Sequence, residues 1–87
     1  MSLSRERIDL KLPLLIIKAG HGFLACGYIN VETCNRTGEA CAIVSGVQSH
    51  EDMLQAEVKA VSAAAARLGV QPGQRGAAAL ELLDRGL

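Results

Sequence analysis

The segment from Ala40 to Leu83 carries the strongest structural signals of this 87-residue chain and reads ACAIVSGVQSHEDMLQAEVKAVSAAAARLGVQPGQRGAAALELL. Its start, Ala42-Ile43-Val44, predicts a buried strand that ends at Ser45-Gly46. Ser49 and Asp52 then form a capping box, which predicts the beginning of a helix. We therefore expect a strand followed by a capped helix, a glycine-rich turn and a second helix.

Apolar spacing predicts that the first of these helices extends from about Ser49 to Leu68 and ends at Gly69. One aliphatic stripe along it consists of Leu54, Val58, Val61, Ala65 and Leu68. The second helix is expected from about Gly76 to Asp84, with Gly86 as its stop. Residues 49–86 are thus predicted to form a helical region.

The N-terminal half has the patterns of a β region, predicted over residues 8–45. Residues 1–7 are polar, which predicts a disordered tail. Alternation over Ile8–Leu12 predicts a half-buried strand, and Pro13 makes it either an edge strand or a strand followed by a bend. The apolar runs Leu14–Ile17 and Phe23–Val31 predict a hairpin. Residues 32–38 are expected to form a polar connection with one helical turn. The prediction is one α+β domain over residues 1–87, with a small antiparallel or mixed sheet of three to four strands followed by two helices.

Charge and hydropathy exclude several classes of protein. Nine basic residues balance nine acidic ones, and only two residues are aromatic, so no basic or stacking surface for nucleic acid is expected. No apolar run approaches the roughly 20 residues needed to cross a bilayer. The first residues carry charges of both signs and no signal-peptide core, which predicts a cytoplasmic chain.

Three cysteines, Cys26, Cys34 and Cys41, stand at spacings that match neither a disulfide framework nor a paired zinc motif. Adding His21 gives four possible soft ligands, but without the tight pairs that zinc sites use. We therefore predict no metal and no cofactor. Cys26 and Cys41 are expected to be buried on strands, and Cys34 to lie in a loop.

Two places could carry chemistry. Cys26, next to Gly27, could act as a nucleophile if a base lowered its pKa, although the spacing provides no such base. The turn with Gly73, Arg75 and Gly76 opens a helix, and its amides and arginine could bind a small anion. The structural alternatives are a buried strand cysteine and a simple corner between two helices.

Three further polar residues have plain interpretations. Glu57 lies between the aliphatic stripe and a second, alanine-rich flank of the first predicted helix, so it must reach solvent or meet a cation at a subunit interface. This flank consists of Met53, Ala56, Ala60, Ala63 and Ala64. His50 is expected to be solvated in the first helical turn. His21 is expected in the turn of the hairpin.

The hairpin also predicts self-association. Leu14–Ile17 and Phe23–Val31 present apolar side chains on both faces, whereas two short helices can cover only one. An uncovered apolar face normally marks an interface. We therefore expect a homo-oligomer that forms through the N-terminal β region.

Several segments, taken in order, resemble the YunC-like family of small domains of unknown function. They are Gly22–Val31, Ala42–Val47, Asp52–Leu54 and the turn from Leu68 to Gly76. The resemblance implies an α+β domain that tetramerises through its N-terminal β region, and it implies no established activity. The family commonly has an Arg-Glu pair after the last glycine of the turn, where this chain has Ala77-Ala78.

No set of residues specifies a reaction, so the leading hypothesis is a non-enzymatic binding or structural module for an unknown ligand. The alternatives are a small-anion or metabolite site at Gly73–Gly76, and a cysteine-dependent enzyme or redox sensor that uses Cys26. A second copy of the chain is the expected partner, and neither nucleic acid nor a membrane is expected.

Overall fold

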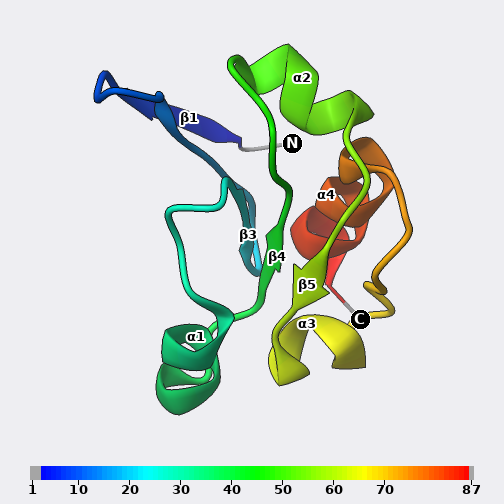
Figure 1. The fold of residues 1–87 in the computed structure, drawn as a ribbon. Coiled ribbons are helices and arrows are strands. Elements are labelled where there is room, and N and C mark those ends of the chain that lie inside the picture. Colours follow the sequence, from blue (N-terminus) through cyan, green and yellow to red (C-terminus); the bar gives the residue numbers. More distant parts are fainter. Residues whose placement is uncertain (1–2, 87) are drawn as a thin grey trace.

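The computed structural model describes residues 3–86, which form a five-stranded mixed sheet and four helices (Figure 1). The strands are β1 (Ser4–Ile8), β2 (Leu14–Lys18), β3 (Phe23–Ala25), β4 (Cys41–Ile43) and β5 (Ala60–Val61). The helices are α1 (Val31–Thr37), α2 (His50–Gln55), α3 (Ala63–Arg67) and α4 (Gly76–Arg85). The α+β class is confirmed, but the predicted three to four strands and two helices are too few.

The strands follow one another across the sheet in chain order. All neighbouring strands are antiparallel except β3 and β4, which are parallel, with Leu24 opposite Ala42. Two parallel strands need a crossover connection, and α1 provides it. This parallel pair aligns the carboxyl ends of β3 and β4 at one end of the sheet.

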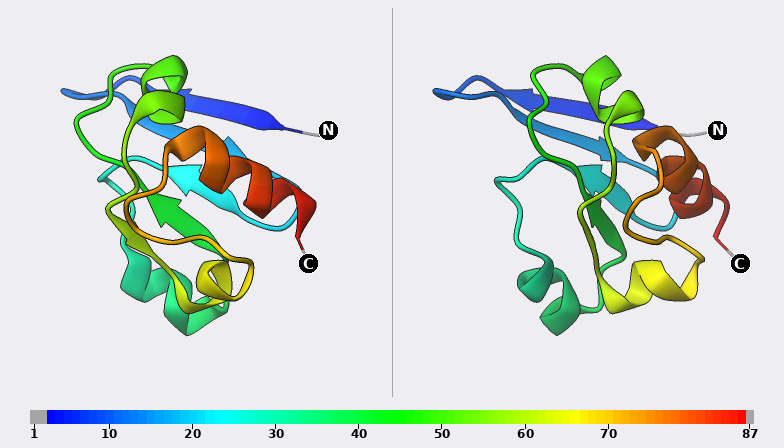
Figure 2. Two further views of the ribbon diagram at one scale, coloured as in Figure 1. Left: turned by 90° about the vertical axis from the view of Figure 1, so that its right-hand side faces the viewer. Right: turned by 45° about the vertical axis from the view of Figure 1, so that its right-hand side comes forward.

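The sheet separates two apolar clusters. The larger one lies between the sheet and α2, α3 and α4, and its fully buried members include Leu15, Leu24, Met53 and Leu83. The smaller one lies on the opposite face under α1 and contains Ala25, Cys34, Cys41 and Ile43. Figure 2 shows α1 on the other side of the strands from α4. Both faces of the central strands are therefore covered within one chain.

The predicted helix from Ser49 to Leu68 is wrong: the chain forms α2, β5 and α3 there. The reason is the exposed edge of β4, whose backbone groups need partners. Lys59 N donates to Ile43 O and Ser62 N donates to Cys41 O, so an extended segment satisfies that edge. Ser62 is fully buried and its hydroxyl accepts from Ala65 N, which makes it the N-cap of α3.

The N-terminal strand is also placed differently. The disordered tail predicted for residues 1–7 is wrong for Ser4–Arg7, which belong to β1; residues 1–2 lie outside the described part. The strand predicted over Ile8–Leu12 is wrong, because Asp9–Leu12 form the turn that leads into Pro13. Every residue of β1 is exposed, so hydropathy gave no signal for it.

The second strand of the predicted hairpin ends early. Phe23–Ala25 form β3, and residues 27–29 turn the chain before α1 begins behind its N-cap, Asn30. Asn30 Oδ1 accepts from Glu32 N at 2.7 Å. The helical turn expected over residues 32–38 is confirmed, and Gly38 ends it with a φ of +81°.

Other helix ends are confirmed as well. Ser49 caps α2 by accepting from Asp52 N at 3.1 Å. Helix α4 begins at Gly76 and ends at Arg85, and Gly86 is its C-cap, the stop that the sequence predicts.

Candidate functional site

The segments that follow the two parallel strands meet at one end of the sheet. Cys26-Gly27-Tyr28 follows β3, and Ser45-Gly46-Val47 follows β4. In sheets with parallel strands, ligands commonly bind just beyond the carboxyl ends of the strands. Loops there are positioned by a rigid scaffold and face solvent, which suits them to binding.

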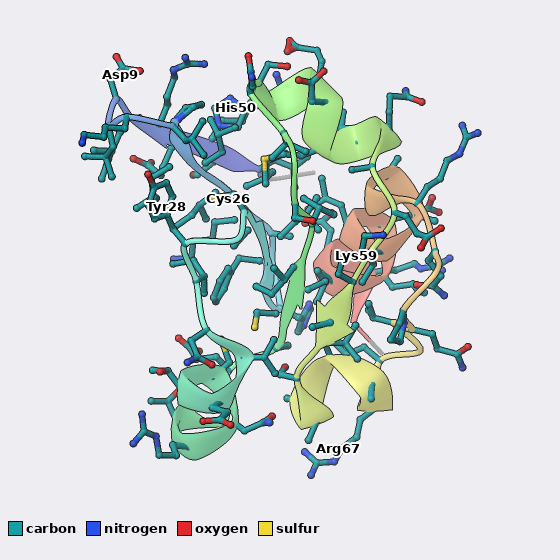
Figure 3. The ribbon with its side chains drawn as sticks, viewed as in Figure 1. Asp9, Cys26, Tyr28, His50, Lys59 and Arg67 are labelled. Carbon is teal, nitrogen blue, oxygen red and sulfur yellow. The ribbon has the colours of Figure 1, made fainter. Side chains whose placement is uncertain are left out.

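These loops enclose a hollow of about 380 Å3. The turn between β1 and β2 supplies its outer wall through Leu12 and Pro13. Figure 3 shows Tyr28 beside the tip of that hairpin, which Asp9 marks. The hollow is lined by Leu12, Pro13, Cys26, Gly27, Tyr28, Ser45, Gly46, Val47 and Gln48. Its size falls in the range of small-molecule sites.

Two glycines keep the floor of the hollow open. A Cβ added to Gly27 or to Gly46 would meet no heavy atom within 4 Å. Gly46 has a φ of +73°, which favours glycine, whereas Gly27 has no positive φ. The backbone of Gly27 is thus left free for close approach by another molecule, although neither strain nor packing within the chain requires a glycine there.

The same loops present free hydrogen-bond donors. Within residues 3–86, the backbone amides of Gly27, Ser45 and Gly46 donate to no protein group. All three residues are exposed, so water can satisfy these amides until a ligand replaces it. Amides directed at one hollow can bind a carbonyl, carboxylate or phosphate oxygen.

Cys26 borders this hollow, and the structure confirms that it is buried. Its backbone N donates to Leu15 O at 3.1 Å, and its Sγ accepts from Leu15 N at 3.3 Å. Both contacts are to β2, so the thiol is held against an inner strand of the sheet. No hydrogen bond among the described residues joins Cys26 to an imidazole or a carboxylate.

Both histidines are engaged away from Cys26. His21 Nδ1 lies 3.1 Å from Asp84 O, at the carboxyl end of α4, and this contact makes Nδ1 the donor. His50 Nε2 lies 2.9 Å from Glu6 O and covers the free edge of β1. His50 is therefore a partly buried structural donor rather than the fully solvated residue that was expected.

The turn with Gly73, Arg75 and Gly76 is tied into the fold by its own amides. Gly73 N donates to Val58 O at 2.9 Å and Gly76 N donates to Ala56 O at 2.8 Å. The Arg75 guanidinium lies 3.5 Å from Gln55 Oε1. The two glycine amides are thus already paired, so anion binding at this turn stays a prediction that the hydrogen bonds do not favour.

Glu57 lies in the connection between α2 and β5 rather than on a helix. Its side chain is exposed and lies 3.5 Å from Lys59 Nζ. The position predicted for it between two helical faces is wrong, because α2 ends at Gln55.

Cys34 is the buried residue of α1, so the loop position predicted for it is wrong. Its Sγ lies 2.6 Å from Cys41 Sγ, and both cysteines are free thiols. Burial, followed by the contact with Cys34, raises the pKa of Cys41 to about 12. The sequence did not bring these two residues together, because the connection between α1 and β4 had no predicted geometry.

A larger hollow of about 650 Å3 lies near the turn between β2 and β3. Its lining includes the charged or titratable residues Glu6, Lys18, His21 and Glu39. His21 is already bound to the end of α4, and three successive amides of this lining are paired: Ala19 N with Gly22 O, Gly20 N with Asp84 Oδ1 and His21 N with Leu83 O. We therefore take the hollow beyond β3 and β4 as the candidate site.

Sequence reasoning found Cys26 and Gly27 but missed Tyr28, Ser45 and Gly46 as members of one site. The small residues Ser45-Gly46 after an apolar strand were visible in the sequence. What was missing was the parallel alignment of β3 with β4, which alone places the two loops together.

Among residues 3–86, no group of three or more histidine, cysteine or acidic side chains is arranged to hold a metal ion. In the same range, no helix has the length and hydropathy needed to cross a membrane.

Comparison with known proteins agrees with this architecture. A crystal structure of TA1206, a protein of unknown function from Thermoplasma acidophilum, is similar to the chain with a TM-score of 0.81. The two sequences are 30% identical, and the match covers 94% of this chain and 93% of that one. A comparison with curated proteins gave no significant match.

The family model that matches spans residues 25–83 and is described as a domain of unknown function, DUF1805. The match begins at the last residue of β3 and ends within α4, so it includes both loops of the candidate site. The family resemblance read from the sequence is confirmed: the chain belongs to the DUF1805 family.

Proposed function

We propose that this protein is a non-enzymatic binding module that takes a small molecule in the hollow beyond β3 and β4. One observation carries the proposal: Gly27 and Gly46 leave open space at a hollow whose lining residues Gly27, Ser45 and Gly46 have unpaired backbone amides. Because Gly27, Ser45 and Gly46 are exposed, water meets these amides until the acceptor oxygen of a ligand replaces it.

The lining indicates the class of ligand. Among the described residues around the hollow none is charged, and Leu12, Pro13, Tyr28 and Val47 provide apolar surface. The amides of Gly27, Ser45 and Gly46 provide donors. The ligand we propose therefore combines an acceptor oxygen, such as a carbonyl or carboxylate, with a branched aliphatic or aromatic group.

The absence of a base supports binding over catalysis. A cysteine that turns over a substrate as an enzyme needs a neighbouring group that lowers its pKa or removes its proton. The Cys26 sulfur accepts from a backbone amide of β2, and no hydrogen bond among the described residues joins it to a base. The imidazoles of His21 and His50 bind backbone oxygens of Asp84 and Glu6 instead.

Replacing Gly27 by valine is expected to abolish binding while leaving the fold intact, because Gly27 lines the hollow and a Cβ added there meets no heavy atom within 4 Å. Isovaleramide and phenylacetate are suitable probes, with isoamyl alcohol as the analogue that lacks the carbonyl. Fragments of this size bind with free energies of about −4 kcal/mol, a Kd of about 1 mM. Binding can be followed as a rise in melting temperature with probe concentration.

The exposed Ala78 on α4 offers a matched control, Ala78→Val, which introduces the same side chain far from the hollow. We expect it to bind the probes like the parent protein. Equal binding by Gly27→Val and the parent would place the site elsewhere and contradict the proposal.

We also propose that copies of the chain associate through the tip of the β1–β2 hairpin. Exposed apolar side chains gather there and beside the hollow: Ile8 is 54% exposed, Leu10 51%, Leu12 60% and Tyr28 48%. Adjacent exposed apolar side chains of this kind favour an interface. A symmetric contact between identical hairpins through Ile8 and Leu10, neither of which lines the hollow, would bury these two side chains, and the family resemblance favours a tetramer.

Light scattering is expected to give a multiple of the 9.1 kDa chain mass for the parent and 9.1 kDa for Leu10→Glu. Leu10 does not line the hollow, so this variant should keep its affinity for the probes. Ala78→Glu is the matched control and should stay associated. A monomeric parent at low micromolar concentration would contradict self-association without affecting the binding proposal.

A further inference from the structure

A pair of cysteines lies on the face of the sheet opposite α4. Cys34 is the buried residue of α1, and Cys41 begins β4, against which α1 packs. Their sulfur atoms are 2.6 Å apart. A disulfide bond is 2.03–2.05 Å long, so bond formation requires a movement of only about half an ångström.

The backbone around the pair holds the two sulfurs in place. Gly38 N and Glu39 N both donate to Cys34 O, which closes the connection between α1 and β4 into a tight turn. Cys41 N donates to Ser62 Oγ at 2.9 Å, which fixes the start of β4. The short distance therefore belongs to an ordered part of the fold on both sides.

Of the two thiols, Cys34 has the route to solvent. It lines a surface hollow of about 450 Å3 together with Phe23, Tyr28, Ile29, Asn30, Thr33, Thr37 and Glu39. Cys34 is 4% exposed, whereas Cys41 has no exposed surface. A molecule as small as hydrogen peroxide can enter a hollow of this size, and Cys34 is the thiol that it meets.

We propose that Cys34 and Cys41 are an oxidation site, at which hydrogen peroxide converts the two thiols into a reversible disulfide. The proposal does not depend on the ligand site beyond β3 and β4. It gives the pair distinct roles: Cys34 reacts with the oxidant and Cys41 resolves the product.

The chemistry needs only the peroxide. The Cys34 thiol gives its proton to water, and its thiolate attacks one peroxide oxygen. The O–O bond breaks, and the departing hydroxide takes up a proton from that water to leave as water, with a sulfenic acid on Cys34. Cys41 sulfur then attacks Cys34 sulfur, the S–O bond breaks, and hydroxide leaves as water with the proton of the Cys41 thiol. Two thiols and one peroxide thus yield one disulfide and two waters.

The raised pKa of Cys41 agrees with its role as the thiol that resolves the sulfenic acid rather than the thiol that reacts with peroxide. Burial, reinforced by the neighbouring Cys34, raises the pKa of the Cys41 thiol to about 12. Cys41 therefore keeps its proton and does not react with peroxide itself. Its position against Cys34 compensates for its low thiolate fraction once the sulfenic acid has formed.

Peptide mapping of the peroxide-treated folded protein tests the proposal. Trypsin cleaves after Lys18, Arg36 and Lys59, so residues 19–36 contain Cys26 and Cys34, and residues 37–59 contain Cys41. After free thiols are blocked by alkylation, we expect these two peptides to be joined, with Cys26 alkylated. Dithiothreitol should release them completely.

Two variants assign the linkage. Cys26→Ser should keep the joined peptides, and Cys34→Ser should lose them. In Cys41→Ser, the sulfenic acid on Cys34 should persist and be trapped by dimedone. The parent protein alone decides the matter if a variant fails to fold.

Three results would overturn the proposal: unlinked peptides at peroxide doses that oxidise Cys34, a linkage that Cys26→Ser removes, or a linkage that forms only after unfolding in guanidinium chloride.

Discussion

Replacing Gly76 by alanine is expected to destabilise the protein by about 3 kcal/mol or more. Gly76 is the first residue of α4, which crosses α2 at this point. A Cβ on Gly76 would overlap the backbone carbonyl of Met53 in α2 and would also crowd the side chain of Leu24. The obstacle is backbone, so no side-chain rotation relieves it. Urea denaturation followed by circular dichroism measures the loss of unfolding free energy.

Alanine substitutions at two other glycines distinguish a stability loss caused by steric overlap from one caused by backbone strain. Gly73 has a φ of +94°, and a Cβ added there would meet no heavy atom within 4 Å, so Gly73→Ala should cost about 1–2 kcal/mol through backbone strain alone. Gly27 has open space and no positive φ, so Gly27→Ala should change stability by less than about 1 kcal/mol. Equal losses at all three positions would contradict the close packing of α4 on α2.

Replacing Leu83 by alanine is expected to cost about 3 kcal/mol, within the 2–5 kcal/mol found for buried leucines. Leu83 has no exposed surface and packs in the larger apolar cluster between α4 and the sheet. Its backbone O also accepts from His21 N at 2.8 Å, so α4 and the β2–β3 turn meet at this residue. The same denaturation experiment gives the loss.

Leu3 provides the matched control, since it is 36% exposed and lies outside the proposed interface at the hairpin tip. Leu3→Ala should cost less than about 1 kcal/mol. A loss at Leu83 no larger than the loss at Leu3 would mean that α4 does not cover the core.

The sequence predicts those elements whose signals are local. The ends of α4 follow from the leucine spacing between Gly76 and Gly86, and the start of α2 follows from the Ser49 side chain, which accepts from a backbone amide three residues on. Such signals involve only neighbouring residues, so they survive in any fold that tolerates the helix.

Elements that depend on distant partners were mispredicted. Ala60-Val61 is extended because β4 needs an edge partner, although the surrounding alanines favour a helix. Strand β1 exists because it pairs with β2, and its exposed charged side chains carry no hydropathy pattern. In both places tertiary hydrogen bonding overrides local preference.

Only one of the two loops of the candidate site could be identified from the sequence, because the position of the other depends on strand pairing. Cys26-Gly27 stood out as a motif, yet its partner loop at Ser45-Gly46 joins it only through the parallel register of β3 and β4. Cys34 and Cys41 are seven residues apart in the sequence, and their contact depends on how α1 folds back onto the start of β4.

Backbone NMR of the labelled protein, titrated with isovaleramide or phenylacetate, tests the binding site most directly. The account predicts that the largest amide shifts fall on Gly27, Ser45 and Gly46, whose amides are unpaired within the described chain. The glycine turn at Gly73 and Gly76, whose amides are already bonded to Val58 and Ala56, should stay unchanged. Shifts centred on that turn, or no saturable shift for either probe, would contradict a binding site beyond β3 and β4.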